Sequence, residues 1–220
     1  DKLSRLMLGA LIWRQTKDLT AAEFINAETF ETLTVNLREK HKDFYIIIAE
    51  LAFYQKKYDI AYKYFIQHLN AGDSLDNRLK KYFTLSAFYI KNFKVFEKYI
   101  NELQPLDAEL TQIYNEFCYS RVLELYQSKI YNEALNYFNK ISDKTLTAKL
   151  TETIAKIYYQ LKDYSNALNY YNSLEKKLVL ENSELFDEYL FVLEKTNNLQ
   201  IKFDLLTQNI DRLNADKLIN

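Results

Sequence analysis

The stretch "YYQLKDYSNALNYYNSL", residues 158–174, decides the fold, because "LYQSKIYNEALNYFNKI", residues 125–141, is nearly the same text. Two more stretches align with this pair, "AFYQKKYDIAYKYF" from Ala52 and "AFYIKNFKVFEKYI" from Ala87. An aromatic residue follows a short polar link in every copy, and subtraction gives intervals of 35, 38 and 33 residues between Tyr58, Phe93, Tyr131 and Tyr164. A unit repeated at such a period sets the whole architecture.

Two weaker copies extend the series outward. They place Leu19 39 residues before Tyr58 and Leu199 35 residues after Tyr164. The chain therefore divides into six approximate units, which together predict one continuous domain over 1–220. The unit boundaries are 3–41, 42–76, 77–107, 108–146, 147–181 and 182–220.

Each unit reads as two helices joined by a short link. In the fifth unit the apolar residues recur at helical spacing on both sides of Lys162-Asp163, and this link is too short for anything but an antiparallel return. Gly72 is placed to end a helix, and Thr20 with Glu23 forms a capping box where the second helix of the first unit should start. The fold class predicted is all-α, built from stacked antiparallel helix pairs, because one pair cannot bury both of its apolar stripes alone.

The repeats resemble the tetratricopeptide repeat (TPR) family. That family places a small residue in the first helix, an aromatic at the start of the second helix and an alanine three residues later. The second unit offers Ala49, Tyr58 and Ala61, and the fifth offers the same pattern; the first, third and last units are degenerate, with Phe96 at the alanine place of the third unit. The resemblance implies an α-solenoid with a right-handed superhelical twist, a concave side lined mainly by first helices, and a role in binding proteins or peptides.

Composition agrees with a helical, folded chain. The 220 residues are 48% hydrophobic and include only two glycines and one proline, too apolar for disorder and too poor in turn residues for a sheet protein. The net charge of −1 weighs against nucleic acid or an anionic membrane as the main partner. The longest apolar run, residues 44–49, is far shorter than the ~20 residues of a membrane helix.

Candidate catalytic groups are few and scattered. Neither glycine lies in a phosphate-binding loop pattern, and Cys118, expected to be a buried thiol, has no sequence relation to His41 or His68. The acids Glu181, Glu184, Asp187 and Glu188 are typical of a solvated helix face. We therefore expect no enzyme activity, no cofactor, no metal site and no small-molecule substrate.

Aromatic residues near the ends of the first helices form the candidate binding surface. Equivalent places in four units hold an aromatic ring, and neighbouring tyrosines add to them; a peptide could anchor on such a ladder. The alternative is that a shift in register places the rings in the core. The candidate residues are Phe53, Tyr54, Tyr82, Phe88, Tyr89, Tyr119, Tyr126 and Tyr159.

Charge is uneven along the repeats. The third unit is basic and the start of the sixth is acidic, which indicates either an oriented charged ligand or two solvated faces. The basic residues are Arg78, Lys80, Lys81, Lys91, Lys94 and Lys98. Some TPR proteins clamp the carboxylate of a chaperone tail with inner lysine, asparagine and arginine residues. The matching places here hold Ile46, Glu50, Tyr82, Glu152 and Lys156, so that mode of binding is not expected.

These observations favour a noncatalytic scaffold or adaptor that binds another protein or a peptide. Two alternatives stay open: an architectural subunit assembled through apolar end helices, and a helical-repeat RNA-binding protein. The chain starts at Asp1, which hints at a processed leader; on that basis we expect a bacterial periplasmic or membrane-associated cell-envelope protein, with the cytoplasm as the alternative.

Overall fold

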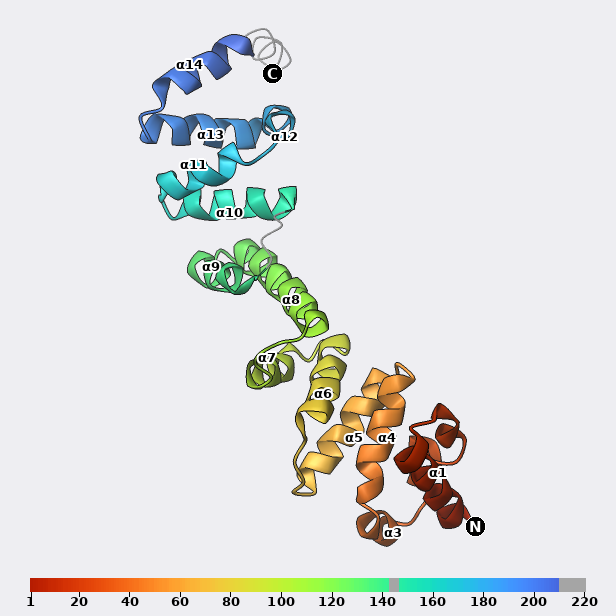
Figure 1. Cartoon of the computed structure of the whole chain (residues 1–220). Helices are drawn as coiled ribbons and strands as arrows, with labels where there is room; N and C mark the ends of the chain where they lie inside the picture. The colour runs from red at the N-terminus through yellow and green to blue at the C-terminus, as the bar shows by residue number, and fades with distance from the viewer. Residues whose placement is uncertain (143–146, 210–220) are drawn as a thin grey trace. The chain divides into compact units, whose positions relative to one another are not determined.

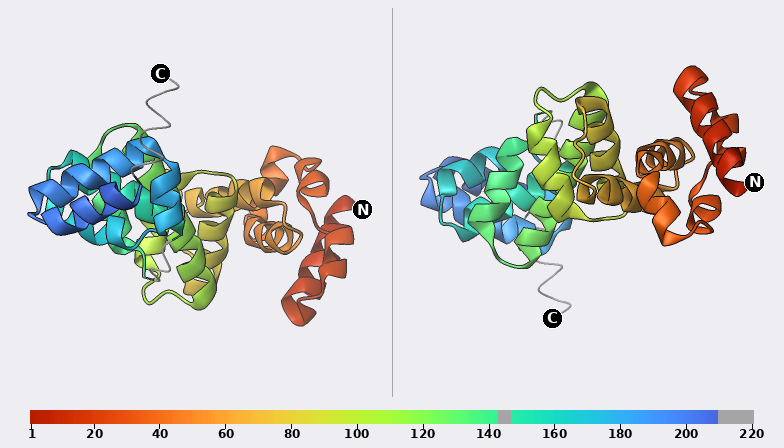
Figure 2. Two further views of the ribbon diagram at one scale, coloured as in Figure 1. Left: turned by 90° about the horizontal axis from the view of Figure 1, so that it is seen from above. Right: turned by 90° about the horizontal axis from the view of Figure 1, so that it is seen from below.

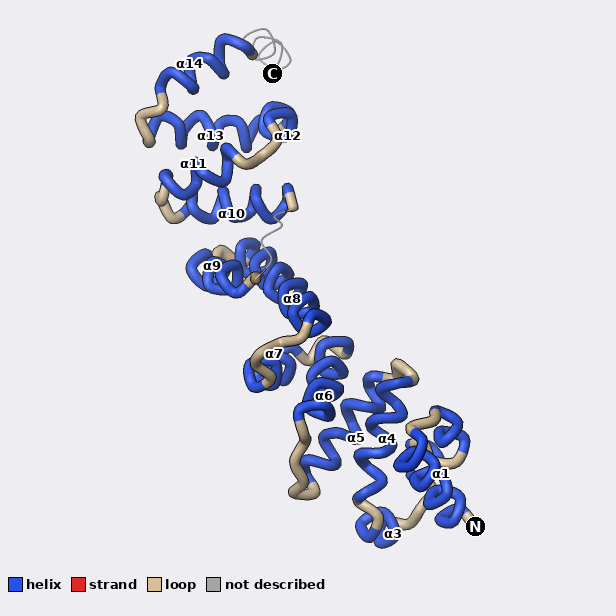
Figure 3. Tube along the Cα trace, in the orientation of Figure 1, coloured by secondary structure: helices blue, strands red, loops and turns tan. Residues whose placement is uncertain are grey.

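The computed structural model describes residues 1–142 and 147–209. These residues form helices joined by loops, with no strand among them (Figure 3). They divide into two compact units, unit 1 over Asp1–Leu110 and unit 2 over Thr111–Asn220, and each unit is described by itself. The predicted all-α class is confirmed for the described residues.

The helices follow the repeats along the chain (Figure 1). Unit 1 contains α1 (Lys2–Thr16), the 3-10 helix η1 (Leu19–Glu23), α2 (Ala27–Glu31), α3 (Val35–Lys40), α4 (Asp43–Tyr54), α5 (Tyr58–Asn70), α6 (Asn77–Tyr89) and α7 (Phe93–Glu102). The helix α8 (Ala108–Gln127) begins at the end of unit 1, and unit 2 continues with α9 (Tyr131–Lys140), α10 (Ala148–Gln160), α11 (Tyr164–Asn172), α12 (Lys176–Glu181), α13 (Ser183–Lys195) and α14 (Leu199–Gln208).

The second helix of each pair begins at the predicted residue. Helices α5, α7, α9, α11 and α14 start at Tyr58, Phe93, Tyr131, Tyr164 and Leu199. Three residues later, Ala61, Ala134 and Ala167 are fully buried. Phe96 occupies this place in the third unit and is also fully buried, so the site accepts a large ring there.

A left-handed residue closes every turn between paired helices. Its φ angle is close to +60° in all five pairs, at Lys56, Lys91, Lys129, Lys162 and Asn197. The next residue donates its backbone N–H to a carbonyl five residues earlier, as Lys57 does to Ala52 at 2.8 Å and Asp163 does to Tyr158 at 3.0 Å. This hydrogen bond is typical of a helix C-terminus whose capping residue is left-handed, where glycine is the usual residue. In these five turns lysine or asparagine takes that place.

An aromatic pair spans four of these turns. The ring near the end of the first helix contacts the ring that begins the second helix, at centroid distances of 5.8, 6.2, 6.1 and 6.3 Å. The pairs are Phe53–Tyr58, Phe88–Phe93, Tyr126–Tyr131 and Tyr159–Tyr164. Because both rings lie next to the turn, the contact fixes where the second helix starts.

The first unit departs from the prediction. In place of one second helix it has η1, α2 and α3, and Asp18 rather than Thr20 caps η1, because the Asp18 carboxylate accepts a hydrogen bond from the Thr20 N–H at 2.9 Å. Side chains of Asn26 and Thr34 then cap α2 and α3 in turn. Three competing caps within 17 residues break the helix that the repeat pattern predicts.

Successive helices pack in sequence order within each unit. In unit 1, α4 packs on α5, and α6 packs on both of them and on α7; in unit 2, α11 packs on α10 and α13. The core of unit 1 contains Trp13, Ile48, Phe65 and Phe83, and α1 lies at the edge of unit 1 in both views of Figure 2.

Gly72 ends α5 at a φ of 93°, as predicted, and Cys118 is buried. The single domain over 1–220 and its superhelical twist stay predictions.

The left-handed lysines give a test of the turn. Glycine adopts this conformation without steric cost, so Lys129→Gly and Lys162→Gly are each expected to raise the free energy of unfolding of unit 2 by about 0.5–1 kcal/mol. The measurement is urea denaturation followed by circular dichroism. Lys129→Ala and Lys162→Ala are the matched controls, since they remove the same side chain and keep Cβ. A gain as large in the alanine variants would contradict the role of the backbone angle.

Candidate partner-binding surface

Five of the predicted site residues lie in unit 1 and belong to one connected set of rings. Phe53 stacks on Tyr82 with centroids 4.4 Å apart, and Phe88 contacts Tyr89 at 5.5 Å. Tyr58 joins these two groups, because it contacts Phe53 at 5.8 Å and stacks on Tyr89 at 4.2 Å. We call the set the aromatic surface; its members are Phe53, Tyr54, Tyr58, Tyr82, Phe88 and Tyr89.

The rings of the aromatic surface are packed on one side and open to solvent on the other. Tyr54 and Tyr89 are 44% and 46% exposed, and the other four are half-buried. None of them is a fully buried core residue, although Phe53 and Tyr82 pack against the core of unit 1. Large rings held in place by neighbours lose little conformational entropy when a partner covers them.

Two tyrosine hydroxyls meet on this surface. The Tyr54 and Tyr82 oxygens are 2.6 Å apart, and this hydrogen bond, followed by burial, raises the pKa of Tyr54 to about 12. Tyr54 also meets the edge of the Trp13 ring at 5.5 Å. The Tyr54 hydroxyl therefore stays protonated at neutral pH, and it offers a partner a hydrogen bond without a charge.

A buried carboxylate lies beside the rings. Glu50, on α4, is 4% exposed; it accepts hydrogen bonds from the Trp13 indole N–H at 3.0 Å and from the Arg78 guanidinium, and the Lys17 ammonium is 3.5 Å away. Burial lowers the pKa of Arg78, but the hydrogen bond and charge of Glu50 raise it by more. Arg78 lies over the Tyr82 ring at 5.5 Å, so this ion network braces the aromatic surface.

The other three predicted residues, Tyr119, Tyr126 and Tyr159, lie in unit 2. Tyr126 and Tyr159 are half-buried, and each contacts the ring at the start of the next helix. Tyr159 also meets Phe191 at 5.8 Å. Tyr119 lines a pocket of about 430 Å³ together with Ser120 and Leu150. Partner binding by these three residues stays a prediction.

A second buried charge occurs in unit 2. Lys156, on α10, is 9% exposed, with Glu152 and Glu184 oxygens at 3.4 and 3.7 Å. Burial lowers the pKa of Lys156, and the charges of Glu188, Glu184 and Glu152 raise it by more. Burial also raises the pKa of Glu188, whose carboxylate accepts a hydrogen bond from the Tyr171 hydroxyl at 2.9 Å. Glu188 thus does not belong to the solvated acidic face that the sequence indicated.

Half of the basic residues of the third unit have acidic partners nearby. Lys80 pairs with Glu102 at 3.0 Å, and Lys81 pairs with Asp107 and Glu109 at 2.7 and 2.6 Å. With Arg78 engaged by Glu50, three of the six basic residues of this unit have acidic partners nearby. The charge of the third unit is therefore weaker than the sequence count implies.

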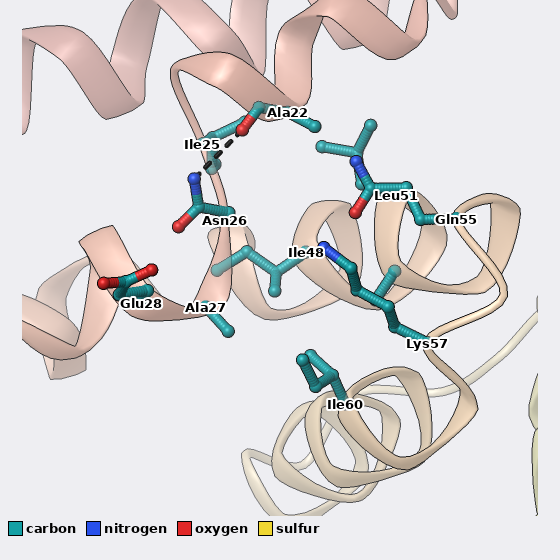
Figure 4. A pocket seen from close by; sticks show the side chains of 11 residues that line it. Ala22, Ile25, Asn26, Ala27, Glu28, Ile48, Leu51, Gln55, Lys57 and Ile60 are labelled. Atoms are coloured by element: carbon teal, nitrogen blue, oxygen red, sulfur yellow. Dashed lines mark hydrogen bonds between the residues drawn. The ribbon is translucent and has the colours of Figure 1, made fainter.

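Figure 4 shows a pocket between the turn that leads into α2 and the helices α4 and α5. Asn26 donates from its side chain to the Ala22 carbonyl at 3.0 Å at the wall of this pocket. The volume of this pocket, about 200 Å³, is below the ~300–1,000 Å³ typical of ligand sites. No cluster of three metal-ligating side chains occurs in residues 1–142 and 147–209, and no helix there is long and apolar enough to cross a membrane.

The candidate catalytic residues have packing roles. His41 stacks on the Phe44 ring at 5.3 Å, His68 is buried with its Nε2 3.4 Å from the Ser74 carbonyl, and Cys118 is fully buried.

Sequence reasoning missed Tyr58, Glu50 and Arg78 as parts of the surface. The position of Tyr58 after the polar link predicts only the start of α5, and its aromatic character is the signal that could have placed it on the surface. Glu50 carried a signal too, since it stands alone among apolar residues from Phe44 to Phe53. A lone acid in such a run has a partner when it is buried, but the partner cannot be identified from one sequence.

No protein-family model and no curated protein matches this chain. Among solved structures, the crystal structure of YrrB, a TPR protein with an unusual peptide-binding site, is similar. The match covers 90% of this chain and 92% of that chain, with 15% sequence identity and a TM-score of 0.41. The helix pairs of the present chain are defined by their own turns and contacts.

The buried carboxylate is expected to matter more than an exposed one on the same helix. Glu50→Gln removes the charge opposite Arg78 and Lys17 and should lower the free energy of unfolding of unit 1 by about 1–3 kcal/mol. Asp43→Asn breaks the exposed pair of Asp43 with Arg14, which is 2.5 Å long, and should cost less than about 1 kcal/mol. Urea denaturation measures both. Equal losses of unfolding free energy in the two variants would mean that the buried network of Glu50 stabilises unit 1 no more than an exposed ion pair does.

Stability of unit 2 should depend on Glu188 and pH. Because the folded-state pKa of Glu188 is raised above the unfolded value, ionisation is harder in the folded state, and the folded state loses stability as pH rises through that range. Glu188→Gln, which can still accept from Tyr171, should therefore stabilise the chain at pH 7 and give little gain below the unfolded pKa of about 4.3. Thermal denaturation between pH 4 and 8 tests this. A gain in stability of Glu188→Gln that does not change with pH would rule out the ionisation of Glu188 as its cause.

Proposed function

We propose that this chain is a noncatalytic interaction module that binds a peptide or a segment of another protein on the aromatic surface of unit 1. The supporting observation is the connected set of half-open rings on α4, α5 and α6. Rings of this kind dominate the energetics of protein interfaces because each buries a large area.

The polar groups near the rings support the same proposal. The Tyr54 and Tyr82 hydroxyls can form hydrogen bonds with a peptide backbone. Arg78, beside them, is already paired with Glu50, so binding does not require a strongly charged partner. An extended peptide complements this surface, because it has alternating apolar side chains and free backbone N–H and C=O groups.

A nucleic-acid partner is supported less well. Stacked tyrosines could hold unpaired bases, but affinity for RNA comes mainly from cations that neutralise phosphates. Near the aromatic surface, Arg78 and Lys17 both have Glu50 as a partner.

The two most exposed rings are the sharpest probes of binding. Peptides selected from a random display library against the 220-residue chain should bind Tyr54→Ala and Tyr89→Ala at least about tenfold more weakly than the parent chain. Thermal midpoints should hardly change, since these side chains are nearly half exposed. Isothermal titration calorimetry measures the affinity.

Phe203→Ala is the matched control, because Phe203 is 64% exposed and lies on α14, which contributes no ring to the aromatic surface. Its affinity for the selected peptide should equal that of the parent chain. Raising NaCl from about 0.1 to 0.5 M should change peptide affinity little, whereas RNA binding would fall steeply. Unchanged affinity in both tyrosine variants would overturn the assignment of the surface.

A further inference from the structure

Helix α14 packs less closely on its partner helix than the corresponding helix of the fifth unit does. Helix α11 packs closely on α10 and has the fully buried Ala167 three residues after its start, whereas α14 has no buried residue. The equivalent place in α14 holds Lys202, whose ammonium pairs with Glu194 at 2.6 Å. Because a lysine keeps its charged end in water, α14 cannot approach α13 as closely as alanine allows α11 to approach α10.

Helix α12 lies outside the pattern of helix pairs and adds a wall beside α13. It is a short helix between α11 and α13, and its Val179 belongs to the same buried cluster as Leu185 and Phe186 of α13. Figure 1 shows α12 at one end of α13, and α14 also packs on α13. The space between α12 and α14 therefore has α13 as its floor.

This space is a pocket of about 450 Å³ within unit 2. Its volume lies in the range of ~300–1,000 Å³ that is typical of ligand sites. Leu180 of α12, Phe186 of α13 and Leu205 of α14 each supply apolar lining, and Ile201 on its edge is 45% exposed. Apolar surface of this kind gains free energy when an apolar molecule replaces the water against it.

Two tyrosine rings complete the lining, and the hydroxyls of both already have partners. The Tyr171 hydroxyl donates to the Glu188 carboxylate at 2.9 Å, and the Tyr189 hydroxyl donates to the Asn172 side-chain oxygen at 2.7 Å. Burial raises the pKa of both tyrosines, so both stay protonated at neutral pH. The two rings therefore offer a ligand uncharged apolar faces.

The charged groups of the lining balance each other. Among the described residues that line the pocket, Lys176 is the cation and Asp204 is the anion, and both are exposed, so they lie at its mouth. The Asp204 carboxylate accepts a hydrogen bond from the Gln200 side chain at 2.8 Å. An ionised ligand would lose its water in the apolar interior without meeting an excess of the opposite charge.

We propose that this pocket binds a small apolar molecule without net charge. The body of the ligand lies against Leu180, Phe186 and Leu205, and any polar group that it carries lies at the mouth. Because the ligand occupies space between α12 and α14, its binding stabilises unit 2. No bond is made or broken, so the site adds a ligand, not a substrate, and it is separate from the aromatic surface of unit 1.

Two fluorescent probes that share one aromatic body test the proposal. Phenylnaphthylamine is neutral, anilinonaphthalene sulfonate adds one negative charge, and both become brighter in an apolar site. The 220-residue chain should bind the neutral probe with a Kd of ~10 μM or lower, and at least about fivefold more tightly than the sulfonate. The neutral probe should also raise the thermal midpoint of the chain.

Leu205→Trp fills the pocket and should weaken binding of the neutral probe at least about tenfold and remove the shift in thermal midpoint. Leu199→Trp is the matched control, because Leu199 is 55% exposed on the same helix and does not line the pocket; its affinity should equal that of the parent chain. Circular dichroism checks that the variants stay helical, and Leu180→Trp, which fills the pocket from α12, replaces Leu205→Trp if that variant does not.

Three results would overturn the proposal. The first is no binding of the neutral probe by the parent chain up to the solubility limit of the probe. The second is equal affinity in the parent chain and the pocket-filling variant, or an equal loss in Leu199→Trp, which would place the probe elsewhere. The third is tighter binding of the sulfonate than of the neutral probe, which would contradict a ligand without net charge.

Discussion

The turn between paired helices is the constraint on which the rest of the structure depends. A left-handed lysine or asparagine closes it, and the following N–H returns to the first helix. In four pairs an aromatic contact spans the same turn. Together these features fix the residue at which the second helix starts. The residue three places later is then fully buried in four pairs, at Ala61, Phe96, Ala134 and Ala167.

The parts of the fold that rest on this local pattern could be predicted from the sequence. The starts of α5, α7, α9, α11 and α14 follow from the aromatic or leucine after the polar link. The first unit could not be predicted, because Asp18, Asn26 and Thr34 compete as caps and propensity does not decide among them. The Glu50 network could not be predicted either, since Trp13 and Arg78 lie 37 and 28 residues away in the sequence.

The aromatic ladder combines two roles that a single sequence does not separate. Phe53 and Phe88 contact the rings of the turn, so their replacement would disturb folding as well as any interface. The next residue in each helix, Tyr54 or Tyr89, extends outward and is nearly half exposed. In the fourth and fifth units this next place holds Gln127 and Gln160. The open rings are for this reason concentrated in unit 1.

One position of the repeat shows how the second and fifth units differ in charge. Glu50 and Lys156 occupy the same place in the first helices of the second and fifth units, with Leu85 and Leu123 between them. Both charges are nearly buried, and a buried charge is stable only with partners of opposite sign. Glu50 has Arg78 and Lys17, whereas Lys156 has Glu152, Glu184 and Glu188. Reversing the charge at this position requires reversing its neighbours, so each unit keeps its own electrostatic character even though both follow one backbone pattern.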